Sequence, residues 1–203
     1  VGVPATKGLR PIGMPGTEKA KTQGYTYNPD KALQLLAEAG FPNGRNLPII
    51  TLTAPDAYVD VCNFVASQLN EIGIPAKVEV MLAGLLRQMM TRSQVGFFKA
   101  GWIADYPDAE TYLACFYSEF PAPPNYSRFS STTFDKWYKQ SLITNDDSTR
   151  FELYGKMDSL VSAEAAVVPL FYDELLHFTQ KNIVGMQRNS LNIIDLKRVR
   201  KTN

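Results

Sequence analysis

Residues 47–80 read LPIITLTAPDAYVDVCNFVASQLNEIGIPAKVEV, and this stretch decides the fold class. Residues 47–53 have the composition of a strand, and residues 74–80 alternate apolar and polar side chains, as a strand with one buried side does. Between them, a helix that ends at Gly73 is predicted by apolar residues on one helical face, which are Tyr58, Val61, Cys62, Val65, Leu69 and Ile72. A strand–helix–strand unit of this length predicts two parallel strands joined by a right-handed crossover.

Upstream of this unit, a helix is predicted to begin after Asn28, which is a favourable N-cap residue. Pro29 suits the first helical position, and Gly40 suits the end of the helix. Apolar residues recur along it at helical spacing, which predicts one apolar face. Residues 1–28 are rich in glycine and proline and are predicted to be a loop.

Downstream, the pattern predicts helices alternating with strands. Predicted helices cover residues 82–89, 109–116, 132–137 and 148–163, with Thr132 or Thr133 capping the third and Asp147 the fourth. Predicted strands cover residues 96–102, 167–172 and 175–179, the last two as a hairpin. This alternation indicates an α/β domain whose mixed sheet is flanked by helices.

Composition excludes several classes of function. The chain of 203 residues has 45% hydrophobic residues and a net charge of +1, so no global field would draw it to nucleic acid or anionic lipid. No apolar run is long enough for a transmembrane segment. Two cysteines (Cys62 and Cys115) and one histidine (His177) exclude a disulfide scaffold and most zinc sites. Cys62 is predicted to be a buried small apolar residue, and neither a metal nor a cofactor is expected.

Aromatic residues gather in one part of the chain. Residues 97–138 hold 13 of the 23 aromatic residues (2 Trp, 10 Tyr and 11 Phe). Aromatic rings supply much of the apolar area of a protein core, and they also line ligand pockets. A core role is the commoner of the two, and we predict that most of these rings are core.

Within this region, residues 99–108 read KAGWIADYPD and place two acids after a predicted strand. Ligands of open α/β sheets bind at the carboxyl ends of strands, so Asp105 could contact a ligand. It could equally form an Asx turn, and Asp108 is predicted to cap the helix that follows. Two acids could also serve acid–base chemistry, but no nucleophile–base constellation accompanies them.

In its motifs the sequence resembles the large extracytoplasmic solute-binding proteins of oligopeptide, dipeptide and nickel ABC importers (bacterial family 5 type). The motifs occur in the family's order and cover nearly the whole chain. They are Pro4-Ala5, Met14-Pro15-Gly16, residues 27–32 (YNPDKA), residues 35–41 (LLAEAGF), residues 68–74 (QLNEIGI), Gly101-Trp102 with Ala104-Asp105-Tyr106, Arg150 with Leu153-Tyr154, and Val168-Pro169-Leu170.

The resemblance implies a periplasmic-binding-protein-like type II fold. It further implies that residues 1–203 form the C-terminal lobe of a two-lobed protein, with the N-terminal lobe outside this sequence. Residues 1–28 would then lie near the hinge, residues 29–180 would form the α/β core, and residues 181–203 would be a C-terminal return segment.

The family's ligand loop carries over onto three residues. Asp105 matches the aspartate that pairs with the α-amino group of a bound peptide, and Trp102 matches the tryptophan that walls its side-chain pockets. Lys99 stands where some relatives carry an arginine facing the peptide carboxylate, and a lysine keeps the charge but loses the bidentate geometry. Residues 107–109 depart from the commoner Asp-Pro of the family.

The resemblance thus implies a non-enzymatic component of an ABC importer that captures oligopeptides or dipeptides by lobe closure. It would deliver them to a membrane permease, and a monomer is the family default. The expected location is periplasmic or otherwise extracytoplasmic, with lipid anchoring as one form. Two alternatives stay open, which are a non-peptide solute (metal chelate, sugar or amine compound) and, more remotely, a carboxylate-dependent hydrolase using Asp105 and Asp108.

Overall fold

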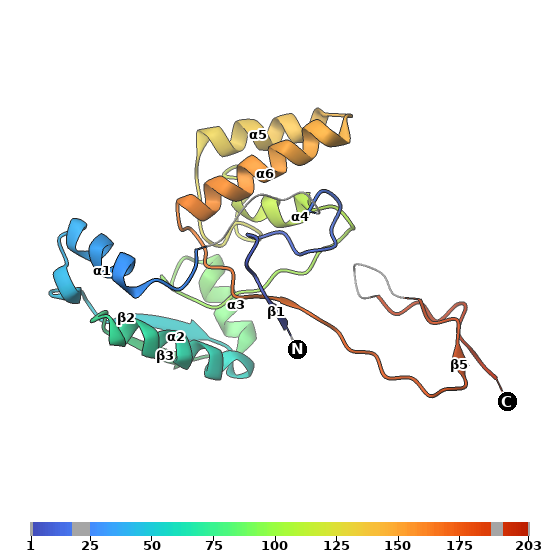
Figure 1. The fold of residues 1–203 in the computed structure, drawn as a ribbon, viewed down its shortest axis with the longest axis horizontal. Helices are drawn as coiled ribbons and strands as arrows, with labels where there is room; N and C mark the ends of the chain where they lie inside the picture. The colour runs from blue at the N-terminus through green and yellow to red at the C-terminus, as the bar shows by residue number, and fades with distance from the viewer. Residues whose placement is uncertain (1, 18–24, 188–192, 203) are drawn as a thin grey trace. The chain divides into compact units, whose positions relative to one another are not determined.

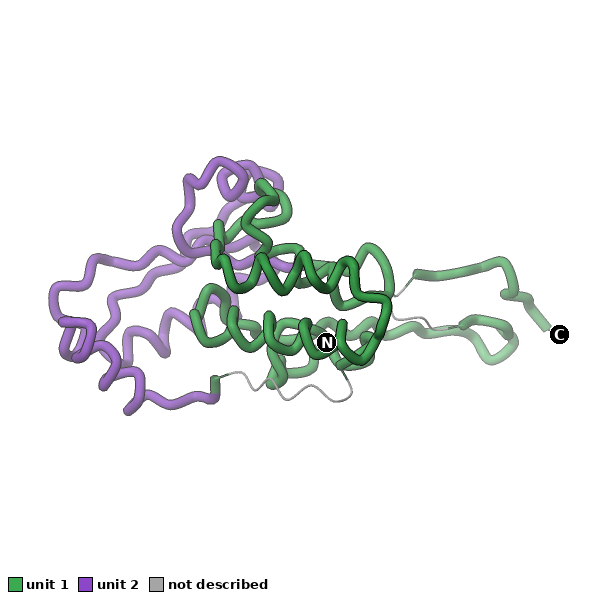
Figure 2. The backbone as a smooth tube through the Cα atoms, turned by 90° about the horizontal axis from the view of Figure 1, so that it is seen from above, with its two compact units in different colours: residues 1–25, 102–203 green, residues 26–101 purple. Residues whose placement is uncertain are grey.

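The computed structural model describes residues 2–17, 25–187 and 193–202, and its chain divides into two compact units. Unit 1 comprises residues 1–25 and 102–203, and unit 2 comprises residues 26–101 (Figure 2). The predicted ligand loop, residues 99–108, therefore begins in unit 2 and ends in unit 1.

Unit 2 contains the predicted strand–helix–strand unit. Strand β2 (Ile50–Ala54) pairs in parallel with β3 (Ala76–Val80), and α2 (Val59–Glu71) connects them after the short 3₁₀ helix η2 (Asp56–Tyr58). Leu52, Ala54 and Cys62 form its buried core, which confirms the prediction for Cys62. Asn70 joins helix to strand, because its side chain donates to the Ala76 carbonyl and accepts from the Ala76 N–H, at 2.9 and 3.1 Å.

A close approach of two loops explains two glycines of unit 2. A Cβ atom on Gly44 would lie 1.9 Å from the carbonyl oxygen of Gly73, and one on Gly73 would lie 2.3 Å from that of Asn43. Both glycines also have positive φ, at 72° and 85°. Gly73 therefore ends α2 as predicted and, in addition, lets the turn of η1 (Pro42–Gly44) pack against it.

Helix α1 (Pro29–Glu38) begins as predicted, since the Asn28 side chain accepts the N–H of Lys31 at 2.9 Å. Its predicted apolar face is not buried, and Leu35 is 50% exposed. Helix α3 (Ala83–Thr91) buries Leu86 and Met90.

The strand predicted over residues 96–102 is wrong except at one position. Thr53 donates to the Phe97 carbonyl and accepts from the Lys99 N–H, at 3.0 and 2.9 Å, which makes a single parallel bridge between Thr53 and Phe98. The next hydrogen bond of a parallel ladder would need the N–H of Pro55, which proline lacks. Pro55 therefore prevents the ladder from continuing beyond Thr53 toward the carboxyl end.

The described part of unit 1 is built on three α-helices and one 3₁₀ helix. Helix α5 (Thr132–Ile143) and helix α6 (Asp147–Ala163) lie side by side, with α4 (Glu110–Leu113) and η3 (Ala114–Phe116) packed against them (Figure 1). The predicted caps are late, by one or two residues for Thr132 or Thr133 and by one for Asp147, since Ser131 and Asp146 accept the N–H groups of Phe134 and Thr149. Each capping side chain accepts the N–H of the third residue of its helix, as an N-cap residue does, so each helix begins earlier than predicted.

Seven of the 13 aromatic residues in the region 97–138 belong to the core of unit 1, of which four are buried (Phe116, Tyr117, Phe134 and Tyr138) and three pack against it half-buried (Tyr112, Phe129 and Trp137). The buried cluster of unit 1 consists of Met14, Ala109, Leu113, Phe116, Tyr117, Phe134, Tyr138, Tyr154, Met157 and Val161. Within it, the rings of Tyr117 and Tyr138 stack with centroids 4.5 Å apart.

Strand pairing in unit 1 differs from the predicted hairpin. Strand β1 (Gly2–Pro4) pairs antiparallel with β4 (Phe171–Asp173), and β5 (Ile183–Val184) pairs antiparallel with β6 (Arg200–Lys201). The partner of β4 is therefore the start of the chain, where a loop was predicted, and residues 175–179 form no strand. A pairing across about 170 residues leaves no local signal in the sequence.

The segment after β1 is fixed to α6 by a buried ion pair. The Arg10 Nε lies 3.0 Å from an Asp158 carboxylate oxygen, and the other oxygen accepts the Leu9 N–H at 2.9 Å. Both side chains are almost wholly buried. Within the described ranges, no helix is long and apolar enough to cross a membrane.

Candidate functional site

Of the three predicted ligand residues, Lys99 lies in unit 2, whereas Trp102 and Asp105 lie in unit 1. The Lys99 side chain is half-buried, and its ammonium lies 3.7 Å from the centroid of the Tyr58 ring. Its backbone N–H makes the bridge to Thr53. Strand pairing and a cation–π contact thus hold Lys99 in place at the end of unit 2.

Trp102 is hydrogen-bonded to helix α4. Its half-buried indole N–H donates to the Thr111 hydroxyl at 3.0 Å, and Thr111 is only 2% exposed. The hydrogen bond fixes the orientation of the indole ring, so the ring presents a defined surface.

Asp105 differs from its acidic neighbours because its carboxylate is exposed and has no hydrogen-bond or ion-pair partner among the described residues. The Asx turn that the sequence allowed is not formed in this part of the chain. Such a turn needs the N–H two residues later, and that residue is Pro107. The Asp105 carboxylate is therefore available to a ligand.

Asp108, by contrast, uses both carboxylate oxygens. One accepts the N–H of Glu110 at 2.9 Å, and the other accepts from the Arg150 guanidinium at 2.8 Å. The predicted N-cap is thus placed one residue too early, because the N-cap position is Ala109, although Asp108 does accept the first N–H of α4. Arg150 also binds Asp147 at 2.8 Å, so the ion pairs join the loop to the start of α6.

Sequence reasoning missed Glu110, the first residue of α4. Its carboxylate is 9% exposed and accepts hydrogen bonds from the hydroxyls of Tyr106 and Tyr138. Burial is the main cause that raises the pKa of both phenols, and the hydrogen bond to Glu110 is the second. Tyr106 stands four residues before Glu110 in the sequence, but the spacing between Glu110 and Tyr138 follows no recognisable pattern. Only the fold therefore reveals the cluster of Tyr106, Glu110 and Tyr138.

An open hollow of about 490 Å³ lies over this cluster, entirely within unit 1. It is lined by Tyr106, Asp108, Glu110, Ser141, Leu142, Thr144, Asn145, Asp147, Arg150 and Tyr154. The lining carries three carboxylates and one guanidinium, which makes its electrostatic character acidic. No group of three or more metal-ligating side chains occurs within the described ranges.

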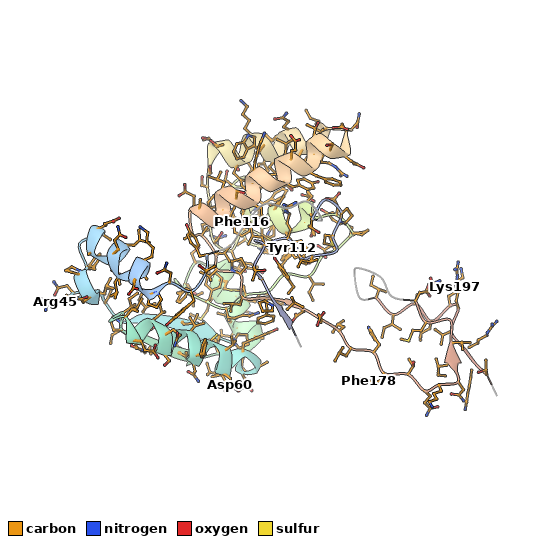
Figure 3. The ribbon with its side chains drawn as sticks, viewed as in Figure 1. Arg45, Asp60, Tyr112, Phe116, Phe178 and Lys197 are labelled. Carbon is orange, nitrogen blue, oxygen red and sulfur yellow. The ribbon has the colours of Figure 1, made fainter. Side chains whose placement is uncertain are left out.

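Tyr112 supports the same loop from α4, where Figure 3 labels it together with Phe116 of η3. Tyr112 and Ala104, the residue before Asp105, both pack against the buried cluster of unit 1. Burial raises the pKa of the Cys115 thiol to about 12, and the nearby charges of Glu110 and Asp105 act in the same direction. Cys62 and Cys115 are both free thiols.

With this geometry established, comparison with known proteins decides the family. Residues 2–123 match the family model of bacterial extracellular solute-binding proteins, family 5, middle region. The chain belongs to this family.

Individual relatives agree. The glutathione-binding protein GsiB of Escherichia coli K12 is 30% identical over 169 residues, which is 79% of this chain and 33% of that protein. Haemophilus influenzae OppA in complex with RPPGFSPFR superposes with a TM-score of 0.83 at 19% identity, covering 98% of this chain and 40% of that one. The periplasmic binding protein DppA of Helicobacter pylori, in complex with peptide STSA, gives a TM-score of 0.80 at 22% identity over 98% of this chain and 39% of that one.

These matches confirm the predicted family and fold class, an α/β, periplasmic-binding-protein-like type II fold. The chain spans about one third of the length of the curated relatives it matches. Those relatives are solute-binding proteins and not enzymes. Asp108, one of the two acids considered for acid–base chemistry, is engaged by Arg150 and by the α4 backbone.

Proposed function

We propose that this family 5 chain is the C-terminal lobe, residues 1–203, of a two-lobed solute receptor of an ABC importer. The receptor captures oligopeptides or dipeptides non-covalently as its lobes close, and it delivers them to a membrane permease. The family match and the superposition on about 40% of two peptide-complexed proteins support this role. In such a receptor, residues 1–28 lie near the hinge and residues 181–203 return toward it. The protein acts as a monomer in the periplasm or, when lipid-anchored, at the cell surface.

The observation that carries the ligand class is the Asp105 carboxylate, which is exposed and unpartnered among the described residues. Its acidic neighbours are engaged, Asp108 by Arg150 and Glu110 by two phenols. When a receptor closes over a ligand, a buried ammonium group needs a charged partner, since an unpaired buried charge is strongly unfavourable. Asp105 supplies that partner for the α-amino group of a peptide.

Local charge favours a cationic group as well. Asp105, Asp108 and Glu110 lie within six residues of one another; burial and the hydrogen bond to Glu110 raise the pKa of the Tyr106 phenol, and all three charges add to this rise. Among the described residues, Arg150 is the cation that pairs with this group, and it is shared with Asp147. The loop thus carries excess negative charge, which attracts an ammonium group.

Trp102 and Lys99 are the other two residues that we propose to contact the ligand. The fixed indole of Trp102 provides an apolar wall for a side chain of the ligand. The Lys99 ammonium, held against Tyr58, provides a positive charge for a carboxylate of the ligand. Both roles depend on closure of the complete receptor.

Glutathione is a second candidate ligand, because the GsiB relatives are glutathione-binding proteins at about 30% identity. Glutathione also carries an α-ammonium group, so Asp105 would serve both ligands. It differs from a linear peptide in its γ-glutamyl linkage, which places that ammonium next to a free carboxylate.

A thermal-shift panel on the full-length protein distinguishes these ligands. The panel contains a free-amine tetrapeptide, its N-acetylated form, glutathione and N-acetylated glutathione. A ligand at about 100 times its Kd adds about 2.7 kcal/mol of stability, which gives a clear shift. A shift by the free-amine tetrapeptide alone supports the peptide receptor, and a shift by glutathione alone assigns the second candidate. If none of the four shifts the protein, capture of tetrapeptides and of glutathione is refuted, and the ligand is to be sought among dipeptides and non-peptide solutes.

A further inference from the structure

The segment 102–108 is irregular and is held mainly by side chains. Three of its residues are hydrogen-bonded to α4 or α6, in the pairs Trp102–Thr111, Tyr106–Glu110 and Asp108–Arg150, and Ala104 packs against the buried cluster of unit 1. The residues between them, Ile103, Asp105 and Pro107, are exposed. Alternate residues are therefore anchored to the helices, and the anchors on either side leave Asp105 turned toward solvent.

Glu110 joins this segment to the core. Its buried carboxylate accepts from Tyr106, the residue directly after Asp105, and from Tyr138 of α5, which is 1% exposed. The N–H of Glu110 donates to Asp108. One carboxylate thus connects the loop, α4 and α5 next to the proposed ligand-binding residue.

We propose that Glu110 is a positioning residue, which through Tyr106 sets the direction of the Asp105 carboxylate toward the ligand's ammonium group. This inference rests on the proposed function, because it concerns how the receptor discriminates a free amine. Hydrogen bonds to a charged acceptor are shorter and stronger than hydrogen bonds between neutral groups. The bond from Tyr106 to the Glu110 carboxylate can therefore hold an irregular segment that has little backbone hydrogen bonding of its own.

Tyr106 offers the mildest way to break the connection. Its ring is 44% exposed, so Tyr106→Phe keeps the packing and removes only the hydroxyl that Glu110 holds. Tyr138→Phe removes the other donor, and Glu110→Gln keeps the size while it removes the charge. Tyr126→Phe, elsewhere in unit 1, is the matched control for loss of a phenolic hydroxyl.

The test compares affinities of the full-length protein for a free-amine peptide and for its N-acetylated form, measured by isothermal titration calorimetry. We expect Tyr106→Phe and Glu110→Gln to weaken binding of the free-amine peptide about tenfold, the size of one charged hydrogen bond. Binding of the N-acetylated form stays unchanged, so the ratio of the two affinities falls. A purely structural role would lower the melting temperature and leave this ratio constant.

Hydrogen exchange of the unliganded protein tests whether Glu110 orders the loop, separately from whether this order matters for binding of the free amine. If Glu110 orders the loop, Tyr106→Phe speeds exchange of the amides of residues 103–106, and Tyr126→Phe does not. An unchanged affinity ratio in Tyr106→Phe, in a wild-type protein that does discriminate the amine, overturns the positioning role. A wild-type protein that binds both peptides equally overturns the proposed function. If, in addition, Tyr106→Phe leaves the exchange of amides 103–106 unchanged, Glu110 has no role in ordering the loop either.

Discussion

The buried ion pair between Arg10 and Asp158 allows a quantitative prediction of stability. Both side chains are almost fully buried, and the Arg10 Nη1 already has no hydrogen-bond partner among the described residues. Asp158→Ala would leave the guanidinium without a counter-charge and the Leu9 N–H without its acceptor. Breaking a buried pair by removing one partner destabilises by about 3–5 kcal/mol, so we expect a loss in that range.

Two further variants separate charge from hydrogen bonding. Asp158→Asn keeps an acceptor for the Leu9 N–H but not the charge, so it should lose somewhat less than Asp158→Ala. The double variant Arg10→Met, Asp158→Leu removes both charges, and buried pairs replaced by apolar residues are often neutral in stability. We therefore expect the double variant to be more stable than either single aspartate variant.

The assay is urea denaturation of the full-length protein, with exchange of the Leu9 amide as a local probe. A loss below about 1 kcal/mol for Asp158→Ala, the range of a solvent-exposed pair, would refute the reasoning. A double variant less stable than Asp158→Ala would refute it as well, because the uncompensated guanidinium could not then be the source of the loss.

Three other predictions follow from single positions. Gly73→Ala places a Cβ atom 2.3 Å from the Asn43 carbonyl oxygen at positive φ, so thermal melting should show a loss of at least about 1 kcal/mol. Met157→Ala empties a fully buried core position and should lose about 2–5 kcal/mol in urea denaturation, whereas a loss below 1 would argue against a close-packed core. Burial raises the pKa of Cys62 and raises that of Cys115 to about 12, so iodoacetamide at pH 8 should label neither thiol until the protein is unfolded; rapid labelling of the native protein would contradict this.

Local signals allowed much of unit 2 to be predicted from sequence. Asn28 and Pro29 start α1, and the alternation over residues 74–80 marks β3, because caps and periodicity depend on residues close in the chain. One limit on the strand expected after Gly96 was visible in the sequence, since Pro55 cannot continue the ladder beyond Thr53.

Long-range contacts could not be predicted in the same way. The pairing of β1 with β4 and the placement of Glu110 between Tyr106 and Tyr138 join residues that have no fixed spacing. At the candidate site, Asp105 is singled out by its place after a predicted strand and by its resemblance to a family motif, while its available carboxylate is a finding of the structure. The network that holds the loop emerged only from the packing of α4 against α5 and α6.

The central claim is that Asp105 pairs with the free α-amino group of the ligand. The most direct measurement is isothermal titration calorimetry of the full-length wild type and Asp105→Asn with one peptide in its free-amine and N-acetylated forms. Asparagine keeps the shape of the side chain and removes its charge, so the variant should lose free-amine binding by tenfold or more and should bind both forms with similar affinity. Retention of free-amine selectivity in Asp105→Asn would contradict the account.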